Sequence, residues 1–240
     1  MNINMGGGGG GGGGGDNNNN KKKIIIDTDP GIDDAMAILV ALESPEVDVI
    51  GLTTIFGNVY TTLATRNALH LLELAGRSDI PVAEGSHLTI TIFGDPEAAD
   101  LVFTSGADIL AVGINVTHQV VLTDADRERL AKSRGKFAQY LCKILDIYFS
   151  YHRDAYNTKG VYLHDPTTLL AAVNPSLITC TEGVVRVQTN GITRGLTMFY
   201  NTKKRFAEVT EWSDKPVVKV AVTVDAPAVV ALVMERLIRS

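Results

Sequence analysis

The chain has 240 residues, of which 45% are hydrophobic and 20% charged, a composition typical of one globular domain with a substantial core. Its net charge of −5 comes without a long basic block, which argues against nucleic acid as a partner and favours a small molecule. We expect no membrane partner because no apolar run is long enough to span a bilayer. The two cysteines lack CxxC or Cys/His spacing, which argues against a disulfide framework or a zinc site and favours a reducing, cytoplasmic location.

The first 20 residues are rich in Gly and Asn and lack the apolar segment of a secretory signal. Such a segment buries too little apolar surface to offset its chain entropy, so we expect a disordered tail over 1–20. The folded domain is predicted to cover 21–240.

From Lys21 onward, short apolar runs alternate with helical stretches. Strands are predicted at IIID (24–27), VDVIGLTTIFG (47–57), 80–83 and 109–116, and helices at 33–42 and 61–75. This βαβα order predicts an α/β fold with a mainly parallel, Rossmann-like open sheet covered by helices.

The second half of the chain begins with a long helical segment. An apolar stripe that includes Phe137, Leu141 and Leu145 predicts one helix over 123–152 with its stripe in the core. Residues 183–224 alternate apolar and polar residues around Gly and Asn turns, which is typical of hairpin strands, and a closing helix is predicted over 226–239.

Four aspartates, Asp27, Asp29, Asp33 and Asp34, are crowded where the first strand leads into the first helix. Ligands of parallel sheets gather at such strand ends. Asp33 as a helix cap, with the others solvated, would explain one or two of them. Four like charges call for a hard cation, because Ca²⁺ or Mg²⁺ binds carboxylate oxygens and keeps them ionised together. We expect Asp29 and Asp34 to converge on the ion while Asp33 faces elsewhere to hold a ligand.

The stretch that holds these aspartates, DTDPGIDDAMAIL, resembles the N-terminal signature of the inosine-uridine nucleoside hydrolases. The resemblance continues through SPEVDVIGLTTIFGN, ATRNALHLLELAGRSDIPVAEG, FGDPEAADLVF and LHDPTTLLAAVNP. By this likeness the chain is similar to the plant-type uridine nucleosidases. It implies a Ca²⁺ cofactor, hydrolysis of ribonucleosides such as uridine and inosine to ribose and a free base, a part in nucleoside salvage and catabolism, and a homo-oligomer, either dimer or tetramer.

The resemblance also implies roles for individual residues. Asp29 is expected to be both a Ca²⁺ ligand and the general base that activates water, with Asp34 and Asp165 as further ligands. His164, beside Asp165, is expected near the leaving base, where it would help to protonate it.

For the substrate, the resemblance assigns Asp33 and Asn58 to the ribose hydroxyls. Tyr148, His152 and Tyr156 are expected to close over the nucleobase, although plain packing explains them equally well.

Structural roles remain open for three of the polar residues. Asp27 is expected to make structural hydrogen bonds near the loop. Asn58 is compatible with a left-handed turn position. Asp165, which precedes Pro166, is a suitable N-cap with proline at N1, and capping is compatible with metal binding.

One internal segment of the family pattern is missing. In the family, about two β/α units separate the stretches matching VAEGSHLTI and IFGDPEAAD, which here join around Thr89–Ile92. That segment supplies a backbone-carbonyl Ca²⁺ ligand, an Asp-Gly loop, and Glu and Asn side chains that grip the ribose; Thr91 stands in place of the last asparagine. We expect impaired activity and exposed sheet edges.

Two other functions remain possible. Asp27-Thr28-Asp29 after a strand also matches the DxD motif of haloacid-dehalogenase-type phosphatases, which use Mg²⁺, but that motif leaves Asp33, Asp34 and LHDP unexplained. The chain could also be a catalytically inactive paralogue or splice form that acts as an oligomer partner.

Overall fold

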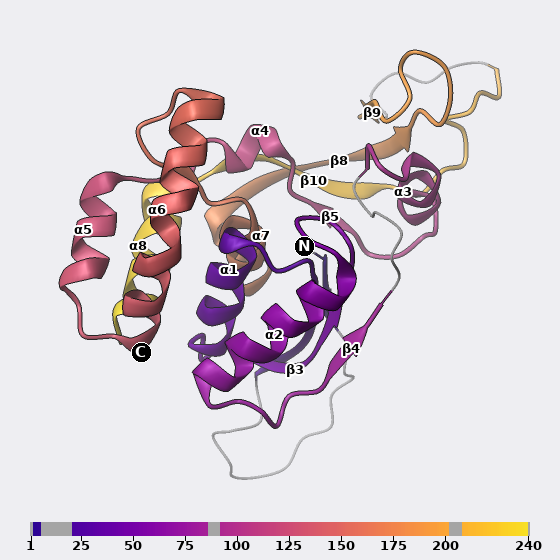
Figure 1. Cartoon of the computed structure of the whole chain (residues 1–240). Coiled ribbons are helices and arrows are strands. Elements are labelled where there is room, and N and C mark those ends of the chain that lie inside the picture. The colour runs from indigo at the N-terminus through magenta and orange to yellow at the C-terminus, as the bar shows by residue number, and fades with distance from the viewer. Residues whose placement is uncertain (1, 6–20, 86–91, 202–207, 240) are drawn as a thin grey trace, which may run out of the picture.

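Over the part of the chain that the structure describes, the α/β fold is built on two four-stranded sheets and one two-stranded sheet (Figure 1). The computed structural model describes residues 2–5, 21–85, 92–201 and 208–239. Most of the predicted join at Thr89–Ile92, including Thr91, lies outside the described residues. In the described part of the chain, no helix combines the length and apolar content needed to cross a membrane.

The first sheet has the strand order β1-β2-β3-β4, with β2, β3 and β4 parallel and β1 antiparallel at the edge. The strands are β1 (Asn2–Met5), β2 (Lys22–Thr28), β3 (Val47–Thr54) and β4 (Val82–Glu84). Side chains alternate between faces, so Ile24 and Ile26 are buried while Ile25 is 37% exposed. The predicted parallel α/β core is confirmed.

Two helices connect these parallel strands, α1 (Ile32–Leu42) and α2 (Thr61–Ala75). Because the order β2-β3-β4 advances in one direction, right-handed crossovers place both helices on the same face of the sheet (Figure 1). Helix α1 is buried along most of its length, whereas α2 buries one side and ends at Gly76, whose φ of 72° suits glycine.

The second sheet has the order β5-β10-β8-β9 and is mostly antiparallel. Its strands are β5 (Leu110–Ala111), β8 (Ile178–Val187), β9 (Thr197–Tyr200) and β10 (Val218–Val224). The hairpin strands predicted over 183–224 are therefore confirmed. The strand predicted over 109–116 is wrong beyond Ala111, because the chain turns into the short helix α4 (Ile114–Thr117) after Gly113.

The single helix predicted over 123–152 is also wrong. The segment forms two helices, α5 (Asp124–Lys132) and α6 (Lys136–Tyr156). Ser133 has extended backbone angles and Gly135 is the N-cap of α6, so the helical path breaks between them although the apolar stripe continues. Phe137, Leu141 and Leu145 are buried, as expected.

Helices α1 and α6 share one hydrophobic core with the closing helix. The elements not yet given complete the fold. They are α3 (Pro96–Phe103), β6 (Val121–Leu122), β7 (Val161–Tyr162), α7 (His164–Val173), a 3₁₀ turn at Pro175–Leu177 and α8 (Ala226–Arg239). The structure places β1 within the segment for which we expect disorder. Residues 6–20 lie outside the described residues, so the expectation for them stays a prediction.

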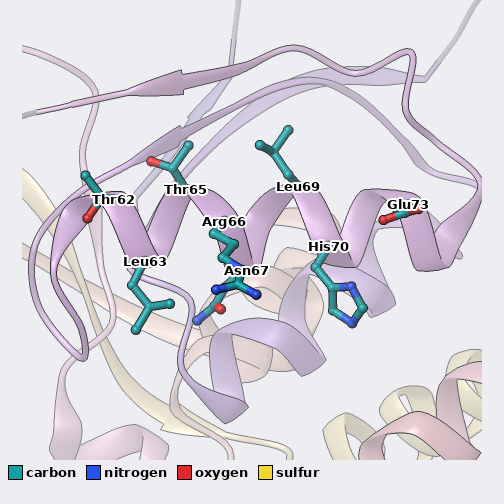
Figure 2. Close-up of a pocket in the computed structure, with 8 residues that line it drawn as sticks. All are labelled: Thr62, Leu63, Thr65, Arg66, Asn67, Leu69, His70 and Glu73. Atoms are coloured by element: carbon teal, nitrogen blue, oxygen red, sulfur yellow. The ribbon is translucent and has the colours of Figure 1, made fainter.

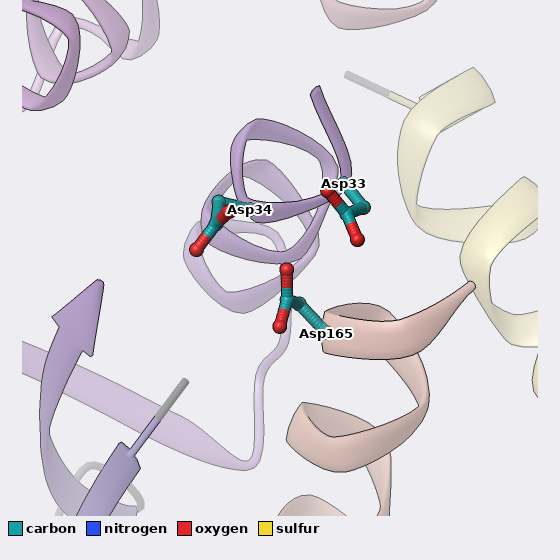
Figure 3. Close-up of side chains that lie close together, drawn as sticks. All are labelled: Asp33, Asp34 and Asp165. Atoms are coloured by element: carbon teal, nitrogen blue, oxygen red, sulfur yellow. The ribbon is translucent and has the colours of Figure 1, made fainter. Parts of the chain in front are cut away.

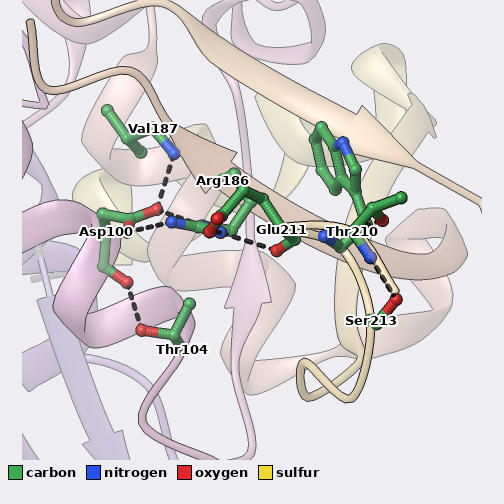
Figure 4. Close-up of polar contacts among 8 residues, drawn as sticks. Asp100, Thr104, Arg186, Val187, Thr210, Glu211 and Ser213 are labelled. Atoms are coloured by element: carbon green, nitrogen blue, oxygen red, sulfur yellow. Dashed lines mark hydrogen bonds and ion pairs between the residues drawn. The ribbon is translucent and has the colours of Figure 1, made fainter. Parts of the chain in front are cut away.

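A charged contact fastens α3 to β8 (Figure 4). The Arg186 guanidinium donates two hydrogen bonds, of 2.8 and 3.0 Å, to the two carboxylate oxygens of Asp100, and the Val187 N–H donates a third at 2.9 Å. Both charged side chains are about four-fifths buried. This Asp100–Arg186 pair lowers the pKa of Asp100, chiefly through the guanidinium hydrogen bonds.

Candidate active site

Three carboxylates converge where the first turns of two helices meet. Asp33 and Asp34 come from α1 and Asp165 from α7, and one oxygen of each lies within 4.8 Å of the other two (Figure 3). We call these three residues the aspartate cluster. Successive helical side chains diverge by about 100°, and Asp165 lies between Asp33 and Asp34, so the expected role of Asp33 in holding a ligand stays a prediction.

The helix that carries Asp165 starts earlier than predicted. Helix α7 begins at His164 with Leu163 as its N-cap, so Asp165 and Pro166 lie inside the first turn. The prediction of Asp165 as N-cap with proline at N1 is therefore wrong. A carboxylate in the first turn still lies near the positive end of the helix dipole.

Asp34 is 1% exposed and is held by neutral donors from three segments. The Thr28 hydroxyl donates to Oδ1 at 2.6 Å, and Oδ2 accepts from the Gly31 N–H at 3.2 Å and from Asn58 Nδ2 at 2.9 Å. The carboxylate therefore caps its own helix by reaching back to Gly31, so the cap comes from Asp34 and not from Asp33. These hydrogen bonds fix the orientation of the Asp34 carboxylate, which is a candidate metal ligand.

Asp29 lies at the end of β2 and is bound to the loop that follows β3. Its Oδ2 accepts from the Asn58 N–H at 2.6 Å, and its backbone carbonyl accepts from Asn58 Nδ2 at 3.3 Å. Asn58 is not among the described residues with left-handed backbone angles, so that alternative is wrong. Asn58 instead connects Asp29 to Asp34, while Asp29 itself is not one of the three converging carboxylates.

Two glycines leave the space for this arrangement. A Cβ on Gly57 would lie 2.1 Å from Asp29 Oδ2, and a Cβ on Gly31 would lie 2.6 Å from Asn58 Nδ2. Both distances are too short for real contacts, so any larger residue would displace the Asp29 carboxylate or the Asn58 amide. The adjacent glycine letters in DPGIDD and FGN were the available sequence signal for this constraint.

Electrostatics in the site disfavour the charged forms. Burial first, and the neighbouring Asp34 carboxylate second, raise the pKa of Asp29, raise that of Asp33 to about 6 and raise that of Asp165 well above its usual value. Several carboxylates with raised pKa values in one place are typical of functional sites.

The donor set fits a hard divalent cation. Oxygen ligands of one Ca²⁺ bind at 2.3–2.6 Å and so lie at most about 5 Å apart, which the spacing of the aspartate cluster satisfies. A divalent ion would also remove the repulsion that raises the pKa values of these carboxylates. The cluster could therefore hold a metal ion of this kind.

Histidine and tyrosine rings gather beside the aspartates at the C-terminal end of α6. We call this set the histidine–tyrosine cluster, and its members are His118, Tyr148, His152, Tyr156, Tyr162 and His164. It brings together the four predicted residues His164, Tyr148, His152 and Tyr156. Tyr156 is 45% exposed and His152 only 1%, so the set runs from the core to the surface.

The environment of His164 keeps its ring neutral near neutral pH. Burial, followed by the neighbouring rings of His118 and His152, lowers the pKa of His164 to about 4. The ring centroids of His118 and His164 are 5.3 Å apart. The His118 ring also stacks on the Tyr162 ring, with their centroids 4.2 Å apart. Sequence reasoning missed His118 and Tyr162, although the short stretches NVTH and YLHD hold both of them.

Tyr148 joins the two clusters. Hydrogen bonding from the Tyr148 hydroxyl is one of the interactions that lower the pKa of Asp33, and burial and the Asp33 charge raise the pKa of the tyrosine above its usual value. The ring of Tyr148 also meets His152 edge-on at 4.3 Å. The carboxylates and the aromatic rings therefore form one continuous site.

Asp27 lies apart from this chemistry. Its Oδ1 accepts a hydrogen bond of 2.5 Å from the Thr53 hydroxyl of the neighbouring strand. The structural hydrogen bond expected for Asp27 is confirmed.

A surface hollow lies over the outer side of α2 (Figure 2). Its lining comes from this helix alone and consists of Thr62, Leu63, Thr65, Arg66, Asn67, Leu69, His70 and Glu73. None of these residues is a predicted site residue, and one helix provides no opposing wall for a ligand. We therefore place the candidate site at the aspartate cluster.

Comparison with known proteins places the chain in one family. The family model described as inosine-uridine preferring nucleoside hydrolase matches residues 24–91 and 89–231. The chain is 54% identical to "Probable uridine nucleosidase 2" of Arabidopsis thaliana over 314 residues, covering 90% of this chain and 98% of that protein. It is 35% identical to "Uridine nucleosidase 1" of the same plant over 312 residues, covering 90% and 93%.

Among solved structures, the chain is similar to a plant nucleoside hydrolase, the PpNRh1 enzyme. The identity is 41% and the TM-score 0.87, with 91% of this chain and 99% of that chain covered. The match to the family model breaks at 89–91, and the 314-residue alignment is longer than the 240-residue chain. Positions of the Arabidopsis relative therefore lack a counterpart here.

Proposed function

Because this chain belongs to the inosine-uridine preferring nucleoside hydrolase family, we propose that it hydrolyses the N-glycosidic bond of uridine and inosine to ribose and the free base, with Ca²⁺ as cofactor. The convergence of Asp33, Asp34 and Asp165 is the observation that carries the proposal. It gathers carboxylates next to aromatic rings, as binding of a cation and a nucleoside requires.

The metal would be held by Asp34 and Asp165 of the aspartate cluster together with Asp29, while Asp33 of the cluster would face the ribose. The fixed orientation of Asp34 and the raised pKa values of Asp29 and Asp165 support this assignment. A bound Ca²⁺ would keep these carboxylates ionised and would acidify water in the site.

In the reaction, the oxygen of a water molecule forms a bond to the anomeric carbon while the bond from that carbon to the nucleobase breaks. Asp29 takes the proton of the attacking water, and the electron pair of the broken bond leaves with the base nitrogen. Asp33 and Asn58 hold the ribose hydroxyls. His164 stabilises the departing base, and Tyr148, His152 and Tyr156 enclose it.

The haloacid-dehalogenase alternative is less well supported. It needs Asp27 as the nucleophile, but the Asp27 carboxylate is engaged by Thr53 within the sheet. It also leaves Asp165 and the histidine–tyrosine cluster without a task.

We further propose that the domain spans 21–240 and lacks an internal segment near 89–92. The broken family match and the long alignments support this. So does the first sheet, because α1 and α2 cover one face while Ile25 and Ile50 on the other are 37% and 42% exposed. Parallel sheets usually have both faces covered. Loss of ribose and metal contacts in that segment would slow hydrolysis.

The second candidate is an inactive oligomer partner, and the exposed Ile25 and Ile50 favour a surface that another chain covers. Both candidates retain the aspartate cluster. They differ in turnover, since only the enzyme releases ribose.

Calorimetric titration of the purified chain with Ca²⁺, followed by assays of ribose release from uridine and inosine, tests the proposal. Binding of about one ion and calcium-dependent release of ribose are expected. Calcium binding without ribose release from either nucleoside would favour the inactive partner. Absence of calcium binding would contradict the metal assignment.

The proposed gap has its own test, in which the corresponding segment of the Arabidopsis relative is inserted at 89–92. Faster uridine hydrolysis and tighter calcium binding are expected, because the site residues on both sides of the join remain in place. If the chain without the insert already matched the relative in rate, the gap would not impair this site.

A further inference from the structure

A residue of another element engages the histidine that we assign to the leaving group. Thr117, the last residue of α4, places its Oγ1 2.7 Å from Nδ1 of His164, across 47 positions of sequence. Thr117 is 3% exposed, so water does not compete freely for this contact. The contact leaves Nε2 as the nitrogen that a ligand can meet.

A hydroxyl that donates to Nδ1 requires that nitrogen to carry no proton, so the direction of this hydrogen bond decides which ring nitrogen is protonated. The Thr117 hydroxyl has one proton and two acceptors within reach, Nδ1 of His164 at 2.7 Å and the carbonyl oxygen of Ile114 at 3.5 Å. The distance to the carbonyl is at the limit of a hydrogen bond, whereas the distance to Nδ1 is ideal. These distances favour donation by the hydroxyl to Nδ1, which would leave the ring proton on Nε2.

We propose that Thr117 is a positioning residue that fixes His164 as the Nε2–H tautomer, so that the neutral imidazole presents an N–H to the departing nucleobase. The inference rests on the proposed hydrolysis. A neutral imidazole can stabilise a developing negative charge as a hydrogen-bond donor. With the opposite tautomer, Nε2 would carry a lone pair and would repel that charge.

The ring packing supports a fixed orientation of the imidazole. His118, the residue after Thr117, lies with its ring centroid 5.3 Å from that of His164, and Tyr162 lies at 5.8 Å. Because these rings limit rotation of the imidazole, Nδ1 stays facing the hydroxyl of Thr117.

The test compares Thr117→Val, which keeps the shape and removes the hydroxyl, with Thr117→Ser, which restores it. Thr167→Val is the matched control, because Thr167 is fully buried nearby but its hydroxyl donates to the Leu163 carbonyl. The full chain is labelled with ¹⁵N-histidine, and the His164 signals are assigned with His164→Gln. Turnover of uridine and of a nitrophenyl riboside is measured in parallel.

We expect a protonated Nε2 in the unmodified chain, in Thr117→Ser and in Thr167→Val, and loss of that pattern in Thr117→Val. Uridine kcat should fall roughly 10–100-fold in Thr117→Val with little change in KM, and the nitrophenyl riboside should be affected less. Protonated Nδ1 in the unmodified chain, or no rescue by serine, would overturn the inference. Absence of ribose release from the unmodified chain would overturn the proposed hydrolysis instead, while the tautomer spectrum still decides the role of Thr117.

Discussion

The aspartate cluster and the Asp100–Arg186 pair are two acidic regions with opposite surroundings. Asp100 faces a guanidinium that donates to both of its oxygens, and its pKa is lowered. Asp33 and Asp165 face other carboxylates in a buried setting, and their pKa values are raised. An aspartate side chain is therefore stabilised as an anion in the Asp100–Arg186 pair and destabilised as an anion in the aspartate cluster.

This difference separates a structural contact from a ligand site. The Asp100–Arg186 pair satisfies its charge within the chain, so its task is to hold α3 against β8 (Figure 4). Charge repulsion within the aspartate cluster costs free energy of folding and would be relieved by a bound cation. Substitutions in the aspartate cluster should therefore change calcium affinity and turnover, whereas substitutions in the Asp100–Arg186 pair should change the free energy of unfolding.

The largest effect is expected from Asp34→Ala. It removes the carboxylate that Thr28, Gly31 and Asn58 orient, so calcium affinity should fall by about 100-fold or more and uridine hydrolysis should become undetectable. Calorimetry and ribose release measure this. Asp100→Asn is the control and should bind calcium normally. Asp29→Ala should likewise lose calcium affinity and turnover. Unchanged calcium affinity in either variant would refute the ligand assignment.

His164→Ala should separate chemistry from metal binding within the site. Calcium affinity should stay unchanged because the residue is assigned to the leaving group, while uridine turnover should fall by roughly 10²–10⁴-fold. An activated nitrophenyl riboside needs less help to leave and should lose less. Equal losses on both substrates would assign His164 to positioning.

Gly57→Ala tests the close packing around Asp29. The added Cβ would lie 2.1 Å from Asp29 Oδ2, so the carboxylate must move, and turnover should fall roughly 10–100-fold. Gly51→Ala in the same region is the control, since its Cβ would meet nothing closer than 3.8 Å. Similar turnover in the two variants would show that the position of Asp29 is not critical.

Asp100→Asn should affect stability and leave the site intact. Removal of the charge weakens two guanidinium hydrogen bonds and one backbone bond in a mostly buried place, at a cost of roughly 1–3 kcal/mol in the free energy of unfolding. Denaturant unfolding measures it. Glu97→Gln, at the exposed contact with Arg194, is the control and should unfold nearly as the unmodified chain does.

The pH dependence of stability should have opposite sign in the two regions. Folding raises the pKa of Asp33 to about 6. Its contribution to stability is therefore fully present when the pH is below the usual pKa of aspartate, and it is lost as the pH rises through about 6. The lowered pKa of Asp100 gives a contribution that is lost only as pH falls below the usual value. In chelator, the free energy of unfolding should fall as the pH rises from about 4 to about 6.

Added Ca²⁺ should reduce that fall, because it stabilises the ionised carboxylates. Chemical denaturation at several pH values, with and without calcium, measures both effects. A stability that rises over this range in chelator would contradict the raised pKa values of the aspartate cluster.

Local patterns predicted the part of the fold that positions the aspartates. The apolar run of β2, the helical spacing of α1 and the turn residues between them are short-range features, so they placed Asp29 and Asp34 at the carboxyl end of a parallel strand. Hydrophobic periodicity did not reveal the break at Ser133–Gly135, because the apolar stripe continues through it.

The sequence by itself determined the residue types of the site and their order along the chain. Only the tertiary structure decided that Asp33 meets Asp165, that Asn58 links Asp29 to Asp34, and that Thr117 engages His164. These partners come from different elements, and their separation in space depends on how β2, α1, α4 and α7 pack. Periodicity within one element carries no information about that distance, since side-chain direction repeats locally while packing joins segments far apart in sequence.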